Sequence, residues 1–252
     1  RLESGRMRRF GVGEGLLESS IQTGCLSATE EGGVWGISDA YRHFYWNGKR
    51  FLNSSESFPA GFPEQKGMFL ARGGVIFRKE DYRRFLFTAP GVSRELVGLP
   101  LVEGLSAGWL SPDGRELLVI IGSTLWVQQG SGWASRDLGI NFKELSVSMI
   151  RDREGRIWIR SLKRLYRMKT PQSPLEDLSR RAALGGVEAC FFAEDALGRV
   201  WTNNTGSLVW FKDHDAGTLG EAEGLPHGGA NVLMVDREGS LWGGTVDGLS
   251  RY

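Results

Sequence analysis

The sequence has few of the side chains with which most enzymes and metal sites are built. Its 252 residues include two cysteines and three histidines, and these occur at no spacing that binds zinc. The sequence motifs of the common hydrolases, metalloproteases and nucleotide-binding proteins are also missing. We therefore expect a protein that is not an enzyme and that uses no metal and no cofactor.

Long apolar runs and an excess of charge of one sign are missing as well. No apolar run approaches the roughly 18 residues that indicate a membrane-spanning helix. The 31 basic and 30 acidic side chains leave a formal net charge of +1, so no overall field attracts nucleic acid, and we expect no such partner. Proline is scarce at eight residues and glycine abundant at 36, which favours many tight turns over disorder.

The most informative stretch is residues 235–252, where turn-forming and strand-forming residues alternate. Asp236 and Gly239 suit a tight turn, because an aspartate side chain bonds to its own backbone and glycine tolerates positive φ. Trp242 favours a strand, and Asp247 followed by Gly248 is a strong hairpin signal. The stretch predicts three short strands joined by two tight turns.

Related stretches recur along the chain at intervals of 34 to 49 residues. Residues 152–159 and 195–202 repeat the aspartate, glycine and tryptophan of the C-terminal stretch, and residues 31–36, 67–70 and 112–119 are shorter or degraded copies. The tryptophan, or the residue in its place, falls at positions 35, 69, 118, 158, 201 and 242. A period of roughly 40 to 45 residues, with several short strands in each, is the signature of a β-propeller blade.

The repeat predicts an all-β fold, a β-propeller of six four-stranded blades, with seven as the alternative, in a single domain over residues 1–252. The blades are expected at residues 20–51, 55–87, 105–137, 146–168, 188–219 and 231–252. The N-terminal strand is expected to complete the last blade and close the ring, because closure removes exposed sheet edges. Ser173, Pro174 and Gly185 predict one short helix near 174–184, in the place of an outer strand.

Residues 236–251 also resemble a known family. Their pattern, Asp-x-x-Gly-x-Leu-Trp-x-Gly-Thr-x-x-Gly-Leu-x-Arg, is similar to the two-component regulator propeller repeat, found in extracytoplasmic sensor regions of bacterial hybrid histidine kinases and related signalling proteins. The other copies replace the Gly-Thr pair, for example by Arg160-Ser161 or Asn203-Asn204. The resemblance implies a periplasmic or extracytoplasmic domain, a piece of a longer membrane-anchored protein whose transmembrane and output domains lie outside these residues.

A ligand is expected at the mouth of the propeller channel, on the face where the turns between second and third strands emerge. The copies diverge from the repeat there, and divergence on a repetitive scaffold is where a binding surface can be added. The basic side chains Arg72, Arg160 and Lys163 lie at such divergent positions and could bind an anionic group of a ligand. The predicted ligand-binding residues are Asp39, Arg72, Arg160, Lys163, Asn203, Asn204, His227, Asn231 and Asp247. A solvated polar rim without a ligand is the alternative.

The repeated aspartates and tryptophans are expected to be structural. Asp152 and Asp195 fall in the same turn of different blades, and turn formation explains them. Trp158 and Trp201 fall within the second strand, where a large ring packs between adjacent sheets. A tryptophan outside the repeat, at position 109, 126 or 133, is a candidate for stacking on a sugar or peptide.

The propeller repeat and the absence of catalytic motifs predict a non-catalytic ligand-binding or interaction domain, and the resemblance implies that it is the sensor propeller of a bacterial signal-transduction protein. The expected partners are an oligosaccharide or other small ligand, a second copy in a homodimer, and the covalently linked domains outside this stretch.

Two alternatives stay open. The Asp-x-x-Gly-x-x-Trp repeat is similar to that of streptogramin lyases, metal-dependent propeller enzymes, for which His227, near Glu221 and Glu223, is the candidate base. The second is a pure protein–protein scaffold, which a large exposed apolar patch would favour.

Overall fold

The structure is a computed structural model, and it describes the chain in segments. The described residues are 2–3, 6–7, 21–28, 34–38, 43–47, 49–53, 68–71, 74–78, 85–89, 92–95, 105–111, 116–140, 142, 147–181, 184–187, 190–225, 229–230, 232–235, 239–245 and 248–252. The chain divides into two compact units, residues 1–101 with 110–116, and residues 102–109 with 117–252.

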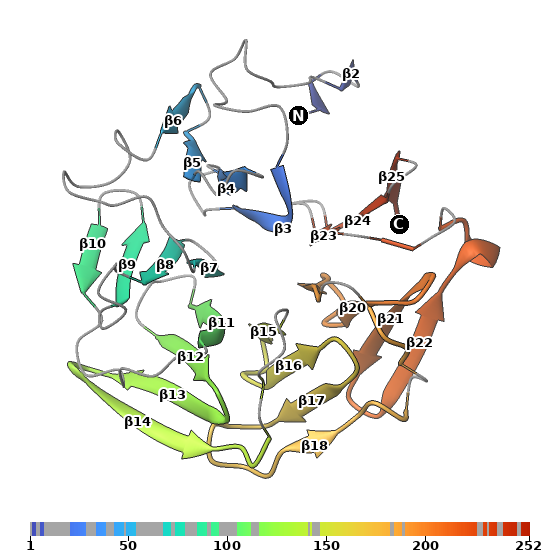
Figure 1. Ribbon diagram of the computed structural model, residues 1–252. Coiled ribbons are helices and arrows are strands. Elements are labelled where there is room, and N and C mark those ends of the chain that lie inside the picture. Colours follow the sequence, from blue (N-terminus) through green and yellow to red (C-terminus); the bar gives the residue numbers. More distant parts are fainter. Residues whose placement is uncertain are drawn as a thin grey trace. The chain divides into compact units, whose positions relative to one another are not determined.

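The first unit contains two four-stranded sheets and a two-stranded ribbon (Figure 1). The strands of the first sheet are β3 (Ile21–Ala28), β4 (Val34–Ser38), β5 (His43–Trp46) and β6 (Phe51–Asn53). Those of the second are β7 (Met68–Ala71), β8 (Gly74–Arg78), β9 (Phe85–Ala89) and β10 (Val92–Glu95). The ribbon pairs β1 (Leu2–Glu3) with β2 (Arg6–Met7).

The described residues of the second unit form three four-stranded sheets and one three-stranded sheet. The first sheet has β11 (Leu105–Leu110), β12 (Leu117–Ile121), β13 (Thr124–Gln129) and β14 (Gly132–Asp137). The next has β15 (Val147–Arg151), β16 (Ile157–Ser161), β17 (Leu165–Met168) and β18 (Glu176–Asp177). It is followed by β19 (Phe192–Glu194), β20 (Val200–Asn204), β21 (Ser207–Lys212) and β22 (Asp215–Leu219). The last sheet has β23 (Val232–Val235), β24 (Leu241–Thr245) and β25 (Gly248–Arg251).

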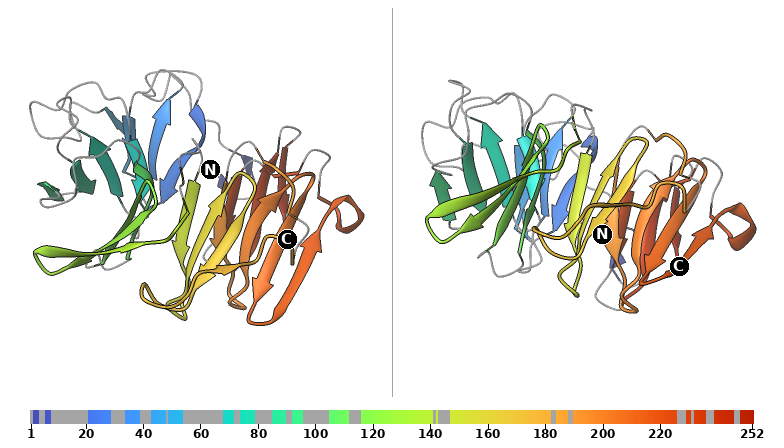
Figure 2. Two further views of the ribbon diagram at one scale, coloured as in Figure 1. Left: turned by 60° about the horizontal axis from the view of Figure 1, so that its bottom comes forward. Right: turned by 90° about the horizontal axis from the view of Figure 1, so that it is seen from below.

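Within each sheet of the second unit, strands adjacent in sequence are neighbours, and the strand pairs run antiparallel. Successive sheets also lie side by side, as the yellow and orange strands show in both views of Figure 2. Within this unit, the two middle sheets, β15–β18 and β19–β22, are therefore each covered on both faces by a neighbouring sheet. The second strands β12 and β16 are buried along their whole length. A fully buried strand reads as a continuous apolar run instead of an alternating one.

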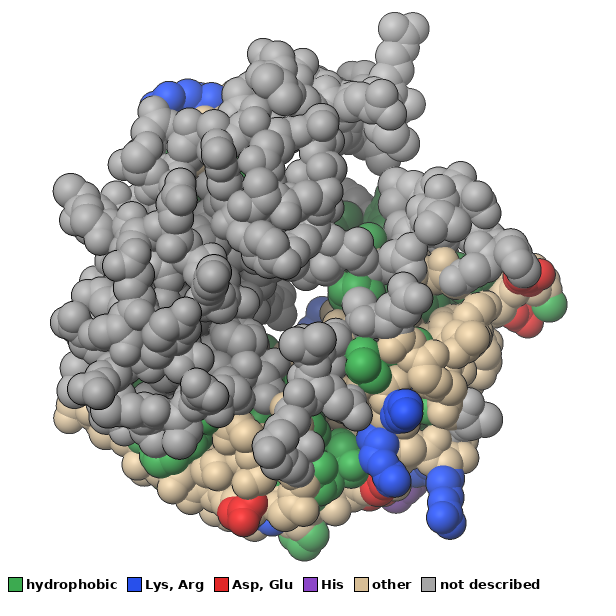
Figure 3. Space-filling model, in the orientation of Figure 1, with side chains coloured by type: hydrophobic (Ala, Val, Ile, Leu, Met, Phe, Trp, Pro, Cys, Tyr) green, Lys and Arg blue, Asp and Glu red, His purple; other side chains and the backbone are tan. Residues whose placement is uncertain are grey.

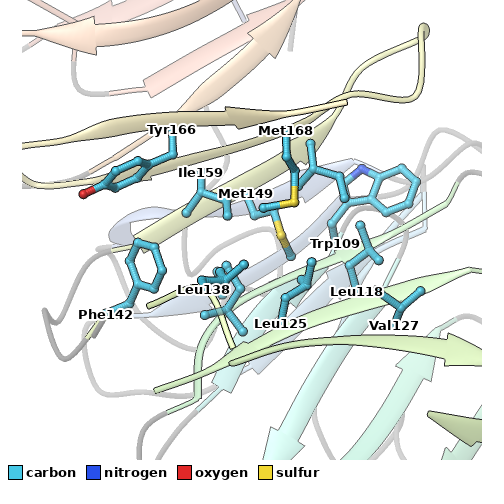
Figure 4. Packing of buried hydrophobic residues seen from close by; sticks show 13 residues of the cluster. Trp109, Leu118, Leu125, Val127, Leu138, Phe142, Met149, Ile159, Tyr166 and Met168 are labelled. Atoms are coloured by element: carbon cyan, nitrogen blue, oxygen red, sulfur yellow. The ribbon is translucent and has the colours of Figure 1, made fainter. Parts of the chain in front are cut away.

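Strand alternation decides which neighbour each side chain meets. Ile157 and Ile159 of β16 pack against the sheet β11–β14, in a core that includes Trp109, Leu118 and Phe142 (Figure 4). Trp158, between the two isoleucines, points to the opposite face and packs with Val200, Val209 and Phe211 of the next sheet. One strand thus joins two hydrophobic cores, as the period of two along a strand requires.

The predicted ranges locate the sheets but not all of their strands, because each range contains at least the first two strands of one antiparallel sheet. The outer strands β10 and β18 lie beyond the predicted ranges 55–87 and 146–168. The position of the repeat within the second blade is corrected. The repeat marker, which is the repeated tryptophan or the residue in its place, was predicted at Phe69, but Phe69 lies on β7, the first described strand of its sheet, and not on the second strand. In the other five sheets the marker is the second residue of a five-residue strand, a position that Val75 occupies in β8. With Val75 as marker, the intervals become 40, 43, 40, 43 and 41 residues.

The helix predicted near 174–184 is wrong for the residues described there. Glu176 and Asp177 form β18, which pairs with β17 as the outer strand, and the chain then turns over residues 179–181. Arg167 of β17 binds Glu176 through both Nε and Nη2, and the amide of Leu178 donates to the carbonyl of Leu165. These cross-strand bonds hold the segment extended, and tertiary pairing overrides the local helix signals. The only helix in the described part of the chain is a single 3₁₀ turn, η2 (Glu221–Glu223).

Closure of the last sheet by the N-terminal strand stays a prediction. The described N-terminal strands form the ribbon β1–β2, in which Leu2 pairs with Met7, and the sheet β23–β25 has three described strands. The number of blades and the assignment of residues 1–252 to a single domain likewise stay predictions.

Candidate functional site

The repeated aspartate organises a small buried network in the sheet β15–β18. One carboxylate oxygen of Asp152 accepts hydrogen bonds from Nε of Arg156 at 2.6 Å and from the indole N–H of Trp158 at 2.7 Å. The other accepts from the backbone N–H of Arg156 at 2.8 Å, which closes the turn. Trp158 is fully buried and Asp152 is 5% exposed. The motif therefore joins a turn, an ion pair and a core tryptophan through one carboxylate.

The next sheet repeats this network at Asp195. Its carboxylate accepts from the backbone N–H groups of Leu197 and Arg199, from Nε of Arg199 at 2.6 Å and from the indole of Trp201 at 2.8 Å. Burial works to raise the pKa of Asp195, but the hydrogen bonds from Trp201 and Arg199 outweigh it and hold the pKa below its usual value. The carboxylate is thus kept charged as a structural anchor.

In both networks an arginine also lies over the tryptophan ring. The guanidinium carbon of Arg199 is 4.9 Å from the ring centre of Trp201, and that of Arg156 is 5.8 Å from Trp158. Burial works to lower the pKa of Arg156, whereas hydrogen bonds to Asp152 and Asp213 raise it overall. In the last sheet Arg251 of β25 lies over Trp242 at 5.5 Å and binds the hydroxyl of Ser240. The structural interpretation of the repeated aspartates and tryptophans is confirmed for the described networks at Asp152 and Asp195.

Of the predicted ligand-binding residues, Arg160 is the most deeply buried among those described. Its side chain is 0% exposed, and the guanidinium donates to the carbonyls of Ser161 at 2.7 Å and Gly185 at 3.2 Å. Gly185 belongs to the connector between β18 and β19, defined here as residues 184–187. The buried guanidinium therefore positions this connector and is not presented to solvent.

Asn203 and Asn204 also act on the chain between β18 and β19. The side-chain oxygen of Asn204 accepts from the backbone N–H of Gly185 at 2.8 Å, and that of Asn203 accepts from Phe191 at 3.1 Å. The hydroxyl of Thr205 donates to the carbonyl of Gly186 at 2.7 Å, and Val187 donates to the carbonyl of Leu162. The connector is thus bonded to β16 or the turn after it at one side and to β20 or the turn after it at the other. Two predicted site residues, Arg160 and Asn204, therefore bind this connector, and Asn203 binds Phe191 just before β19.

Lys163 is the described member of the predicted set that is exposed. It lies in the turn between β16 and β17, beside Arg164, whose guanidinium binds Asp177 at 2.9 Å. The predicted positions Asp39, Arg72, His227, Asn231 and Asp247 lie outside the described residues.

The other candidates from the sequence are distributed differently. Trp109 is 6% exposed and belongs to the core shown in Figure 4, so it is not available for surface stacking, whereas Trp126 and Trp133 are partly exposed. Glu221 and Glu223 are exposed on η2, and Glu223 accepts from the backbone N–H of Gly220 at the start of that turn. Among the described residues, no three histidine, cysteine, aspartate or glutamate side chains gather as a metal site would require.

The roles of Arg156, Arg199 and the connector were not predicted from the sequence. An arginine follows the repeated aspartate by four residues at Arg156 and Arg199, a recurrence that could have indicated the ion pair. Gly185 and Thr205 carry no such signal, because their contact depends on how two sheets pack.

Part of the described surface is drawn in Figure 3, where lysine and arginine side chains over β18, β21 and β22 lie close to acidic side chains and a histidine.

Solved structures with this arrangement of sheets belong to proteins of several kinds. The extracellular domain of a hybrid two-component system of B. thetaiotaomicron matches with a TM-score of 0.65 and 12% identity, over 93% of this chain and 33% of that one. A virginiamycin B lyase of Staphylococcus aureus, solved with quinupristin, matches with a TM-score of 0.64 and 9% identity, over 94% and 86% of the two chains. The YCF48 protein bound to a D1 peptide matches with a TM-score of 0.60 and 14% identity, over 94% and 79%.

At these identities the likeness establishes the fold alone, which is propeller-like. The chain spans about a third of the length of the sensor domains that it matches. No protein-family model and no curated protein matches the sequence. Within the described residues, we find no helix with the length and apolar character needed to cross a bilayer.

Proposed function

We propose that this chain is a non-catalytic sensor or interaction propeller of a bacterial signal-transduction protein. The observation that carries the proposal is the fold likeness, over 93% of the chain, to an extracellular domain of a hybrid two-component system. The C-terminal repeat, with its resemblance to the two-component regulator propeller family, supports it from the sequence. The domain would lie outside the cytoplasm, with membrane and output segments elsewhere in the protein, and it would be free to form a homodimer.

The proposed architecture is a closed propeller of six blades, with seven as the alternative. The regular intervals of 40 to 43 residues between equivalent second-strand positions support a single repeating unit throughout the chain. The N-terminal strand is the proposed fourth strand of the sheet β23–β25.

The repeated aspartates are occupied by structural contacts, so a ligand is not expected to bind them. The carboxylates of Asp152 and Asp195 are nearly inaccessible, and their oxygens already accept several hydrogen bonds each. A ligand would instead contact exposed side chains in the turns between the second and third strands. Among the described residues, Lys163 in the turn between β16 and β17 is such a side chain. The proposed ligand is an oligosaccharide or another small molecule with an anionic group.

A thermal-shift screen of the chain against neutral and anionic oligosaccharides tests this proposal. A ligand that binds only the folded state stabilises it by RT ln(1 + [L]/Kd), so a specific saccharide raises the melting temperature with concentration. We expect Lys163→Ala to weaken the shift while leaving the melting temperature without ligand unchanged, since this side chain is exposed. Arg160→Ala is unsuitable for this purpose, because the buried guanidinium supports the connector. Saccharides that give no shift would argue against the ligand-binding form of the proposal.

A streptogramin-lyase-like enzyme is the second candidate, and one observation favours it. The chain covers 86% of the virginiamycin B lyase that it matches, compared with 33% of the sensor domain. Incubation with quinupristin and a divalent cation, followed by mass spectrometry of the antibiotic, separates the two candidates. Conversion of quinupristin that is lost in His227→Ala would support the lyase and overturn the sensor proposal.

A pure protein–protein scaffold is the third reading. Val232 and Met234 are 38% and 53% exposed and alternate along β23, so they share one face of that strand. Light scattering of the purified chain across a range of concentrations tests whether such a surface forms a homodimer.

A further inference from the structure

The turn between β21 and β22 receives three arginines from the neighbouring sheet. Arg156 donates through Nη1 to the carboxylate of Asp213 at 2.8 Å, and Arg167 donates through Nη1 to the backbone carbonyl of the same residue at 2.9 Å. Arg181, which follows β18, donates to the carbonyl of His214. All three arginines belong to the segment that contains the sheet β15–β18, whereas Asp213 and His214 lie in the sheet β19–β22.

Each arginine that reaches Asp213 is also anchored within its own sheet. Arg156 pairs with Asp152 at 2.6 Å and with Glu154 at 2.8 Å, and Arg167 binds Glu176 of β18 through Nε at 3.1 Å and Nη2 at 2.8 Å. The guanidinium carbons of Arg156 and Arg167 lie 5.8 and 5.3 Å from the ring centre of Trp158. Their side chains are only about a tenth exposed, at 11% and 10%. The donors are thus held in place before they meet the turn.

The backbone conformation of Asp213 allows it to accept hydrogen bonds from both Arg156 and Arg167. Its φ of 50° is positive, and it is the one non-glycine residue in the described part of the chain with that conformation. Aspartate tolerates the left-handed region better than most residues, because its short side chain bonds locally. Here its carboxylate and its carbonyl are both bound by arginines of the adjacent sheet. Glycine would adopt the same backbone conformation and keep the carbonyl, but it would lose the carboxylate.

We propose that the β21–β22 turn is a clasp that locks the sheet β15–β18 to the sheet β19–β22, so that the outer strands of the two sheets open together and not one by one. The clasp joins β17, β18, β21 and β22 at their exposed margin. A second bond between the sheets supports it from another turn, because the backbone N–H of Arg153 donates to both carboxylate oxygens of Glu194, at 3.0 and 3.1 Å. Charge-assisted hydrogen bonds of this kind are about twice as strong as neutral ones.

Hydrogen exchange of the native protein, followed by mass spectrometry, tests the clasp with Asp213→Gly. We expect amides of β17–β18 and of β21–β22 to exchange about three- to tenfold faster, in both sheets together, because the turn conformation survives and the ion pair does not. Exchange in β12, which is buried in the core away from the clasp, should stay unchanged. Asp215→Asn in the same hairpin is the matched control, since Asp215 is exposed and gains no arginine partner from β15–β18 in the described structure.

Faster exchange confined to residues 212–215 in Asp213→Gly would overturn the clasp, as would unchanged exchange. A double-mutant cycle of Asp213→Gly with Arg156→Lys gives a second measure. Non-additive effects on exchange in β18 are expected, and strict additivity would contradict a direct coupling. The effect of Asp213→Gly should also shrink in 1 M salt, because the Asp213 carboxylate is 55% exposed and its ion pair is screened.

Discussion

At the scale of single residues, the aspartate carboxylate explains why the repeat contains an arginine and a tryptophan at fixed distances after it. In the networks of Asp152 and Asp195, an aspartate fixes the turn, an arginine four residues later neutralises it, and a tryptophan six residues later donates to it from the core. A buried charge is tolerated only when it is paired and hydrogen-bonded, and both conditions are met by neighbours in the same hairpin. The motif can therefore form within each sheet, whatever lies beside it.

Replacement of Trp158 by alanine is expected to lower the free energy of unfolding by about 3–5 kcal/mol, as is usual for large aromatic rings removed from a core. Trp158 is 0% exposed and packs with residues of two sheets, and its loss also removes one donor from Asp152. Urea denaturation measures the change. Trp133→Ala on the outer strand β14 is the control, with an expected loss well below that of Trp158→Ala, since Trp133 is only partly buried.

Replacement of Asp195 by asparagine is expected to destabilise the protein in a pH-dependent way. The folded-state pKa of Asp195 lies below its value in the unfolded chain, which is about 4. Its charge therefore contributes stability that is fully present above that unfolded value and is lost as the pH falls through the folded pKa. The expected cost is about 1–3 kcal/mol at pH 7, shrinking below pH 4. Urea titrations of both proteins from pH 7 to pH 2 measure it, and a difference that does not change with pH would contradict this account.

At the scale of elements, the connector of residues 184–187 and the strand β18 are held by side chains that are distant in sequence. Arg160, Asn204 and Thr205 fix the connector, and Arg167 fixes β18. Residues that diverge from the repeat are used here to build the path between two sheets. For Arg160 and Asn204, divergence from the repeat therefore has a structural cause.

Gly185→Ala is expected to destabilise the protein by about 1–3 kcal/mol, the usual cost of overpacking. A Cβ atom at Gly185 would lie 2.6 Å from the hydroxyl of Thr205, which is held by its hydrogen bond to the carbonyl of Gly186. Gly186→Ala is the matched control, because a Cβ atom there meets nothing within 4 Å. Thermal melts of the two variants compare the sites. Equal melting temperatures would show that the connector is not held as described.

At the scale of the whole molecule, the last sheet has fewer described strands than the other five sheets. Five described sheets have four strands and the sheet β23–β25 has three, so the outer edge of β25 has no described partner strand. An exposed edge presents unpaired backbone groups and favours association with other strands, and proteins usually cover it. The N-terminal strand is the segment that the sequence predicts for this role.

Deletion of residues 1–10 is expected to lower the melting temperature by several degrees and to speed hydrogen exchange in Gly248–Arg251, if the N-terminal strand pairs with β25. Replacement of the same ten residues by a glycine-serine segment of equal length is the companion variant, and it should behave like the deletion. Unchanged exchange in β25 would mean that the ribbon β1–β2 is independent of the last sheet.

The sequence by itself determined the features that repeat locally. In the copies at residues 152–159 and 195–202, the aspartate, glycine and tryptophan specified a turn and a buried strand, because the interactions that form them lie within about six residues. The spacing of the copies located the sheets. The sequence also located the residue equivalent to the repeated tryptophan in every sheet except the second, where no tryptophan is present and the equivalent position is Val75 and not Phe69.

Only the tertiary structure decided the outcomes that depend on contacts between sheets. It placed Arg160 in the interior on a backbone carbonyl, made residues 176–177 a strand and not a helix, and brought Asp213 to the arginines of the preceding sheet. Local sequence carries no record of these contacts, because each joins residues 9 to 57 positions apart whose proximity is set by packing.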